Sequence, residues 1–439
     1  MGYTDSRGLP ISTSSPEATQ HYREGVDLLL SAWPGAAEAL QRAIEADADF
    51  ALAHAALARL HAIRAEPAEA TARIDAAAGI AARNGTPREQ SHVATLSFAV
   101  TGQARKALDS ALLHLESWPR DVIILSLPLG AFGLFAFSGM ADHDQARVDL
   151  CARHAGHFDA DDWWLLTYRG WALAENGDVR RGRDLVQRGF DLRKANANAA
   201  HALSHAMFEG GAGQDAEALI EGWLPSYDRS GTLHGHIAWH AALSALERGD
   251  PNGALHIYER HVQPSVSLGL PINVMTDAVS LLWRLQIYGY EVPPDLWKAA
   301  KAYSEDKFQK PGLSFIDAHM GLLSAATGDR SAATARVDAL TRLVEQGTLA
   351  AGPVVPAICR AALAFADGDY AGCVRILEPM SCEVVRIGGS GAQREVIEDT
   401  LLVALMRSGE AEKACNLLDK RLHRRPSPRD ARWRQEMAA

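Results

Sequence analysis

The chain is expected to be all-α, a right-handed solenoid of about ten tetratricopeptide-like helix pairs. Two observations predict this fold. A glycine, usually followed by a polar residue, recurs between amphipathic runs, and the alternation typical of β-strands is nearly absent. The spacing ranges from 34 residues (Gly177 to Gly211) to 41 (Gly368 to Gly409). Helix, short turn and helix repeated at this period is the tetratricopeptide pattern.

Each recurring glycine is expected to end a helix in a left-handed cap, because glycine tolerates positive φ without steric cost. An earlier turn, Ala65-Glu66-Pro67, continues the series toward the N-terminus. The glycines are Gly102, Gly139, Gly177, Gly211, Gly249, Gly289, Gly328, Gly368 and Gly409.

We interpret residues 1–439 as a single solenoid domain with ordered repeats over about 20–425. Met1–Ser15 and Arg424–Ala439 are polar and are expected to be frayed tails. The basic run Arg421–Arg432 is expected to be a solvated end. Residues 122–137 are almost wholly apolar and, at the position of a repeat helix, predict a buried helix and not a membrane span.

The charge balance limits the classes of partner. With 54 acidic and 44 basic side chains the net charge is −10, so no general attraction to nucleic acid or to an anionic membrane is expected. Five cysteines, an odd number without a C-x-x-C motif, indicate reduced thiols and a cytoplasmic protein.

Four histidines lie at matching positions of two consecutive repeats. His201 and His205 are four residues apart, as are His236 and His240, so each pair shares one face of its helix. The two pairs are also one repeat apart, since 236 − 201 and 240 − 205 both equal 35. The first helix of each pair lines the concave side of such a solenoid, so the four should form one patch there.

Three interpretations of this patch stay open. The histidines could be hydrogen-bonded structural residues. They could do acid-base work on a small molecule, with Asp277 and His319 as further catalytic candidates. Alternatively, His201, His205, His236 and His240 could ligate a transition metal, although no cofactor is specified by the sequence. Ala202 rules out the zinc-protease motif, which needs a glutamate there.

Other side chains follow the same register and predict a polar, aromatic inner wall. The candidate ligand-binding residues on it are Arg169, Trp171, Glu209, Trp239 and Asp317.

A glycine-rich turn, Gly388–Glu395, opens a helix near the C-terminus. Free N–H groups at a helix start attract anions, and Arg394 adds a fork-shaped donor. We therefore expect Ser390, Gln393 and Arg394 to contact an anionic ligand, or else to form a plain turn. If the solenoid curls about once, it encloses a central cavity and this turn faces the histidines across it.

These blocks resemble the tetratricopeptide repeat protein 38 family over nearly the whole chain. The segments that carry the resemblance are His201–Glu209, His236–Leu243, Asp317-Ala318-His319 and Gly388–Arg394. The resemblance implies the fold and says little about activity. Two functions stay open: a small-molecule pocket on the concave face, which could make the protein an enzyme, and a scaffold that binds a peptide along the groove.

Overall fold

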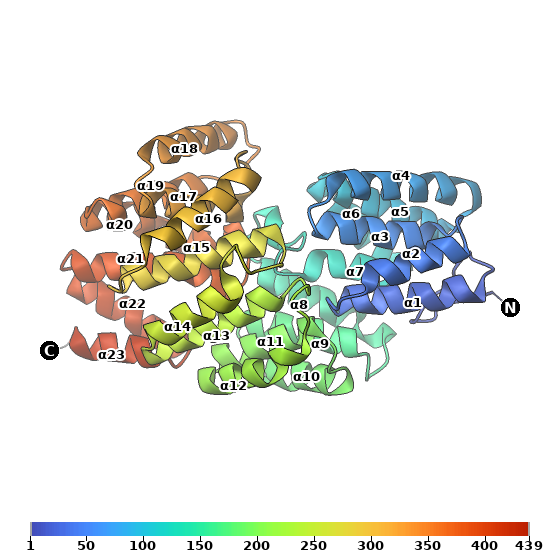
Figure 1. Ribbon diagram of the computed structural model, residues 1–439, viewed down its shortest axis with the longest axis horizontal. Helices are drawn as coiled ribbons and strands as arrows, with labels where there is room; N and C mark the ends of the chain where they lie inside the picture. Colours follow the sequence, from blue (N-terminus) through green and yellow to red (C-terminus); the bar gives the residue numbers. More distant parts are fainter. Residues whose placement is uncertain (1, 438–439) are drawn as a thin grey trace.

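The computed structural model describes residues 2–437, and over this range the protein is an all-α solenoid (Figure 1). The described residues form 23 α-helices and no named strand; the only β-type pairing is an isolated bridge between Thr4 and Pro10. No helix in this range is long and apolar enough to cross a membrane.

Eleven consecutive helix pairs are followed by one last helix, one pair more than the sequence predicted. The additional pair is the first, whose turn at Gly35 lies before the recurring glycines. The pairs are α1 (Pro16–Leu30) and α2 (Ala36–Ala46), α3 (Ala51–Ile63) and α4 (Pro67–Asn84), α5 (Pro87–Val100) and α6 (Ala104–Ser117), α7 (Val122–Leu129) and α8 (His143–His154), α9 (Trp163–Glu175) and α10 (Val179–Leu192), α11 (Ala197–Glu209) and α12 (Gly213–Trp223), α13 (His234–Arg248) and α14 (Pro251–Ile257), α15 (Pro271–Ile287) and α16 (Pro294–Lys307), α17 (Ser314–Ala326) and α18 (Arg330–Glu345), α19 (Val354–Ala366) and α20 (Tyr370–Leu377), α21 (Gly391–Arg407) and α22 (Ala411–Arg424), then α23 (Pro428–Glu436).

The turn chemistry predicted from the sequence is confirmed. All nine recurring glycines have positive φ, from 66° at Gly328 to 97° at Gly177. Ala65 occupies the same left-handed conformation at φ 59°, where a side chain is disfavoured. The repeat therefore shows in the sequence because each helix must end in a conformation that glycine adopts most easily.

Small residues set how closely paired helices approach. In the α9–α10 pair, a Cβ added to Gly170 would lie 2.6 Å from the carbonyl oxygen of Gly182, and the reverse substitution would meet the carbonyl of Gly170 at the same distance. Only glycine allows this contact. It fixes α9, which carries Trp171 and Glu175 toward the inside of the solenoid.

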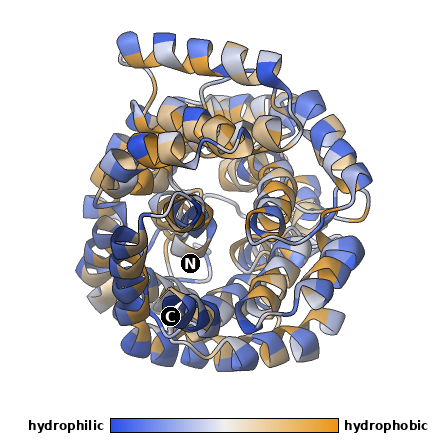
Figure 2. Cartoon of the chain, turned by 90° about the vertical axis from the view of Figure 1, so that its left-hand side faces the viewer, coloured by the Kyte–Doolittle hydropathy of each residue, from blue (hydrophilic) through white to orange (hydrophobic). Residues whose placement is uncertain are grey.

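The solenoid curls until its C-terminal third meets the α7–α8 region (Figure 2). The backbone N–H of Gly389 donates to the carbonyl of Ala131 at 3.2 Å. Arg394 donates to Asp144 across 250 residues of sequence at 3.1 Å. Viewed along the long axis, the helices form a ring, so the inner faces of distant repeats look toward one another.

The apolar segment 122–137 forms the predicted buried helix only in its first half. Helix α7 stops at Leu129, with Pro128 in its last turn, and the chain loops through Gly130 and Gly133 to a short 3-10 turn, Ala136–Ser138. The helix ends early because proline cannot donate a backbone hydrogen bond and glycine favours irregular backbone.

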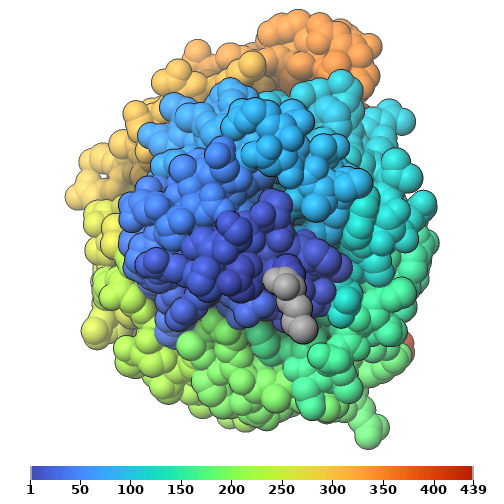
Figure 3. All heavy atoms as spheres, turned by 90° about the vertical axis from the view of Figure 1, so that its right-hand side faces the viewer, coloured from blue at the N-terminus to red at the C-terminus, as the bar shows by residue number. Residues whose placement is uncertain are grey.

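The prediction of frayed ends is wrong for the described residues. At the N-terminal end, which Figure 3 shows in dark blue, Ile11 donates to the carbonyl of Tyr3 at 3.0 Å, and Asp5 pairs with Arg88 at 3.2 Å. At the other end, α23 continues the fold beyond Arg424.

The basic run at the C-terminus is likewise not a solvated end. Arg421 is 2% exposed and pairs with Glu395 and Asp399 at 2.9 Å and with Asp430 at 2.7 Å. Arg425 and Arg429 are buried in the same network. The sequence alone does not predict these pairs, because the carboxylates that partner the three arginines lie on α13 and α21 as well as on α23.

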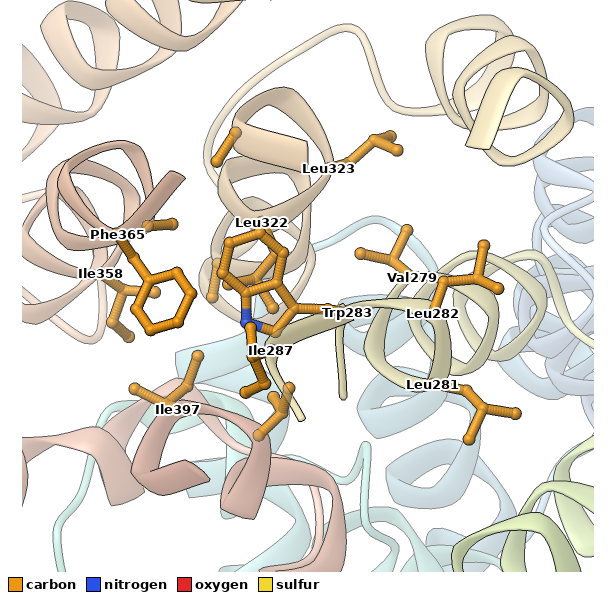
Figure 4. Close-up of a cluster of buried hydrophobic side chains, with 14 of the residues drawn as sticks. Val279, Leu281, Leu282, Trp283, Ile287, Leu322, Leu323, Ile358, Phe365 and Ile397 are labelled. Carbon is orange, nitrogen blue, oxygen red and sulfur yellow. The ribbon is translucent and has the colours of Figure 1, made fainter. Parts of the chain in front are cut away.

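The apolar core of the C-terminal half runs between α15, α17, α19 and α21 (Figure 4). Trp283 is fully buried in it, against Phe365 at 5.8 Å between ring centroids. Its indole N–H donates to the Thr400 hydroxyl at 2.9 Å, so the polar atom of this large side chain is satisfied. This core supports the inner helices that carry the site.

Replacing Arg421 by methionine should lower the free energy of unfolding by about 3–5 kcal/mol, because it leaves buried carboxylates without their cation. The matched control is Arg434→Met, which removes a half-exposed pair with Asp419 and should cost less than about 1 kcal/mol. Urea denaturation followed by circular dichroism measures both. Equal losses would show that the buried network contributes no more than a surface pair.

Candidate functional site

The four repeated histidines meet on the inner face of the solenoid. His201 and His205 come from α11 and His236 and His240 from α13, and one ring nitrogen of each lies within 4.8 Å of the others. The Asn196 side chain caps α11 by accepting from the Ala199 N–H at 3.0 Å, which fixes where that helix begins. The one-repeat spacing thus becomes a cluster of four imidazoles.

The rings are packed against one another. The Nε2 atoms of His201 and His240 are 3.2 Å apart, and the rings of His205 and His240 have centroids 4.1 Å apart. His205, His236 and His240 are buried, and His201 is half-buried. The cluster is therefore a dense group of imidazole nitrogens, and its least covered side is at His201.

Two carboxylates stand behind the histidines. Oε1 of Glu175 lies 3.1 Å from Nδ1 of His205, and Oδ2 of Asp277 lies 2.8 Å from Nδ1 of His236. A carboxylate beside Nδ1 favours the tautomer with the proton on that atom, which leaves the Nε2 lone pair free. The other oxygen of Glu175 accepts from the backbone N–H of Gly391 at 2.7 Å, so the glycine-rich turn holds this carboxylate in place.

The electrostatics favour the neutral form of two of the four imidazoles near neutral pH. Burial, reinforced by the neighbouring imidazoles, holds the pKa of His201 and of His240 well below the usual value. Burial also raises the pKa of Asp277, although His236 opposes it. For Glu175 burial acts in the same direction, but the interaction with His205 outweighs it and lowers the pKa. Neutral imidazoles are the form that binds metals.

Some buried nitrogens of the cluster have no hydrogen-bond partner among the described residues. Nε2 of His205 and Nδ1 of His240 are in this group, whereas Nδ1 of His205 faces the Glu175 carboxylate at 3.1 Å. A buried polar atom without a partner is costly, so each asks for an explanation. An ion bound by the imidazoles would supply one.

A small cavity of about 120 Å³ opens beside His201 and His236. Trp171 and Gln393, both predicted from the sequence, line it. Its other polar lining residues are Thr167, Tyr168, Asn198 and Asn273.

Helical spacing was the signal that could have identified the residues that sequence reasoning missed. Glu175 lies four residues after Trp171, Asn198 three before His201 and Asn273 four before Asp277, so each shares the inner face with a residue that was chosen.

Trp239 is fully buried and does not line this cavity, contrary to its predicted role as a ligand contact. Its ring stacks on His236 at 5.5 Å between centroids and stands edge-on to His240 at 4.9 Å. Trp239 therefore supports the imidazoles from behind.

Three other predicted residues lie away from the cluster. Asp317 pairs with Arg336 and accepts from the Gly312 N–H at 2.8 Å, so it does not orient an imidazole. His319 has Nδ1 2.8 Å from the carbonyl oxygen of Phe315, and burial lowers its pKa to about 4. Arg169 does not line the cavity.

Glu209 lines a different cavity, of about 540 Å³. Burial raises the pKa of its carboxyl group.

The predicted anion clamp has its donors engaged by the protein itself. Ser390 caps α21, and its hydroxyl accepts from the Gln393 N–H while the Gln393 side chain accepts from the Ser390 N–H. Arg394 donates to the Gly389 carbonyl at 2.5 Å and to Asp144. The turn acts on the site through Gly391 and Glu175, a link that sequence reasoning did not find.

A second cluster, which the sequence did not suggest, joins α5, α6 and the start of α7. One oxygen of Asp121 lies 2.9 Å from Nδ1 of His92, 3.2 Å from Nε2 of His114 and 3.1 Å from the Arg88 guanidinium. Because a fixed cation already sits on the carboxylate, this group is a buried ion pair and a poor cation site.

No family model matches the chain. Among solved structures, the chain is similar to one titled "Structure of Naa15/Naa10 bound to HypK-THB", at 12% identity and a TM-score of 0.22, over 93% of this chain and 64% of that one. The TPR domain of P58(IPK) is 11% identical, with a TM-score of 0.22 and 90% of each chain covered. Such TM-scores are too low to support an inference, and the fold is established by the helix pairs themselves.

The buried histidines make stability depend on pH. The folded pKa of His319, about 4, lies below the unfolded value near 6.5, so its stabilising contribution is complete above pH 6.5 and is lost as the pH falls toward 4. His319→Asn removes this proton uptake and should flatten the decline by up to about 1.4 kcal/mol per pH unit. Urea denaturation of EDTA-treated protein from pH 7.5 to 4.5 measures the slope, and an unchanged slope would contradict the assignment.

Proposed function

We propose that this protein binds one transition-metal ion through His201, His205, His236 and His240, and that the ion acts on a small molecule in the adjoining cavity. The observation that carries the proposal is the convergence of four imidazole nitrogens within 4.8 Å, with a carboxylate behind two of them. Histidines paired with carboxylates in this way are typical of metal ligands.

Zinc is the first candidate ion. Four nitrogens at a zinc–nitrogen distance of about 2.0–2.1 Å in a tetrahedron lie about 3.3–3.4 Å apart. The 3.2 Å between Nε2 of His201 and Nε2 of His240 is close to that value, and small rotations of the other two rings would complete the set. Imidazole ligands also suit copper, nickel and iron, so the metal is to be identified by measurement.

The charges around the cluster suit a divalent cation. Glu175 and Asp277 together offer two negative charges, and the nearby cations have other partners: Arg284 pairs with Asp399 at 2.9 Å, and Arg394 and Arg147 both pair with Asp144. Two buried carboxylates without a full counter-charge are unfavourable, and a divalent ion between them would balance both.

The accessible side of the cluster defines where a small molecule would sit. His201 and His236 line the 120 Å³ cavity, and Asn198, Asn273 and Gln393 supply amide groups that can orient a polar group there. Four imidazoles fill a tetrahedral site, so a bound ion would supply Lewis acidity to an oxygen or nitrogen of that molecule only by taking it as a fifth ligand or in place of one imidazole. The protein would then be a metal-dependent enzyme or a metal-linked sensor of that molecule.

One second candidate has an observation in its favour. His236 lines the cavity and is 2.8 Å from Asp277, so this pair could act as a general base without any metal. Metal analysis separates the two functions.

A peptide scaffold is less well supported, because the contacts between residues 131–144 and 385–394 close the ring where a continuous groove would run. Membership of the tetratricopeptide repeat protein 38 family is part of this proposal and implies no reaction.

The protein purified without a polyhistidine tag should contain one equivalent of transition metal by inductively coupled plasma mass spectrometry. His205→Ala should reduce this to below about a tenth, because it removes a ligand and the partner of Glu175. His319→Ala is the control, since it also removes a buried histidine but one outside the cluster. Only trace metal in the unmodified protein would contradict the proposal and favour the acid–base pair.

Neutralising the carboxylates should weaken the metal site without removing a ligand. Glu175→Gln and Asp277→Asn should each lower metal affinity about 10–100-fold, as is usual when a carboxylate behind a histidine is lost. Competition with a chromophoric chelator measures this. Glu209→Gln, which neutralises a half-buried carboxyl in the separate 540 Å³ cavity, should leave the affinity unchanged; a similar loss there would mean that the effect is only one of net charge.

A further inference from the structure

A second cavity, of about 480 Å³, lies on the N-terminal side of the site and joins the small one. Six residues line both cavities, so the two share a wall: Gly130, Phe132, Tyr168, Asn198, Leu233 and Leu270. The larger cavity lies between the α1–α2 turn, α3, α5 and the loop after α7. The two cavities therefore adjoin, and together we call them the channel; His201 and His236 lie at its inner end.

The wall of the larger cavity is apolar along most of its length. Leucine, isoleucine, valine and phenylalanine side chains dominate it, and no carboxylate of the described chain lines it. A channel of this kind favours an extended hydrocarbon or aryl group, because each buried methylene contributes about 0.8 kcal/mol. Representative members are Leu28, Leu60, Leu96, Val100, Leu134 and Phe137.

One cation in this wall, Arg59, is half-buried and has no anionic partner among the described residues. Its guanidinium donates to the Ile123 carbonyl at 2.5 Å and to the Ser126 hydroxyl at 2.6 Å, both uncharged. Burial lowers its pKa to about 10, and among the described ionisable groups only the Tyr168 hydroxyl acts on it appreciably. A cation that is withdrawn from water in this way is usually paired, so Arg59 calls for an anion.

Arg59 is also well placed along the channel. It lines the larger cavity, and its charge acts on Tyr168, a residue that lines both cavities. An anionic group held there would have the histidine cluster on one side and the apolar cavity on the other.

We propose that the ligand of this site is a monocarboxylic acid with an apolar tail. Its carboxylate pairs with Arg59 at the junction of the two cavities and points toward the histidines, and its tail fills the 480 Å³ cavity. The inference rests on the proposed metal function for what happens at the head of the molecule, but binding of the tail and of the carboxylate is independent of it.

Decanoate and 1-decanol are the matched probes, since they share the tail and differ in charge. By isothermal titration calorimetry, decanoate should bind at least tenfold more tightly than decanol, and octanoate about fifteenfold more weakly than decanoate, from two lost methylenes at about fourfold each. Arg59→Met should bring decanoate down to the affinity of decanol. Arg59→Lys, which keeps the charge, should retain part of the preference and guards against a folding defect.

A blocking variant tests the channel itself. Ala99→Phe places a ring in the apolar cavity and should weaken decanoate and decanol alike, whereas Arg59→Met should spare decanol. Equal affinity for the two probes in the unmodified protein, or binding that ignores both variants, would overturn the proposal.

Metal analysis of the same samples keeps the two proposals apart. If decanoate binds through Arg59 but the protein holds no metal, the channel stands and the metal function fails; if metal is present and decanoate does not bind, the reverse holds. In cobalt-loaded protein, decanoate should change the visible absorption bands, because its head lies near the ligands. An unchanged spectrum with normal binding would refute the assigned orientation.

Discussion

The Glu175 carboxylate is the interaction on which the rest of the site depends. One oxygen accepts from the Gly391 N–H, and the other lies beside His205. The first contact spans 216 residues and exists only because the solenoid curls until α21 meets α9. Closure of the ring therefore also positions the carboxylate that orients the His205 imidazole. A solenoid of the same repeats that stayed open would lack the contact between Gly391 and Glu175.

Buried charge explains why the closure is specific. Apolar faces alone would let helix pairs slide against one another, whereas a buried ion pair tolerates only one arrangement with all of its partners in reach. The network around Arg421, the Asp144–Arg394 pair and the Asp121 cluster each tie together helices that are distant in sequence or belong to different repeats. These contacts fix how far the solenoid curls, and so they fix which inner faces look at each other.

The fold could be read from the sequence because its signal is local. A left-handed cap is decided by the glycine at one position, as at Gly177, and the histidine pairs are visible because helical spacing and repeat spacing are both short-range rules. The predictions that failed concern contacts between residues far apart in the sequence. From the sequence, Arg421 is expected in solvent and Arg394 on a ligand, but the fold pairs each with a carboxylate of the protein. Asp317 is likewise expected beside a histidine, but in the fold it pairs with Arg336.

The charge balance at the cluster argues against a purely structural role for the histidines. Burial raises the pKa of Asp277 even though His236 is 2.8 Å away, so at this carboxylate the cost of burial outweighs that contact. A structural histidine can instead bond to a backbone carbonyl, as His319 does with Phe315. Two carboxylates behind four imidazoles fit a group that holds positive charge in front of them, and the cavity beside His201 and His236 shows from which side a ligand would meet that charge.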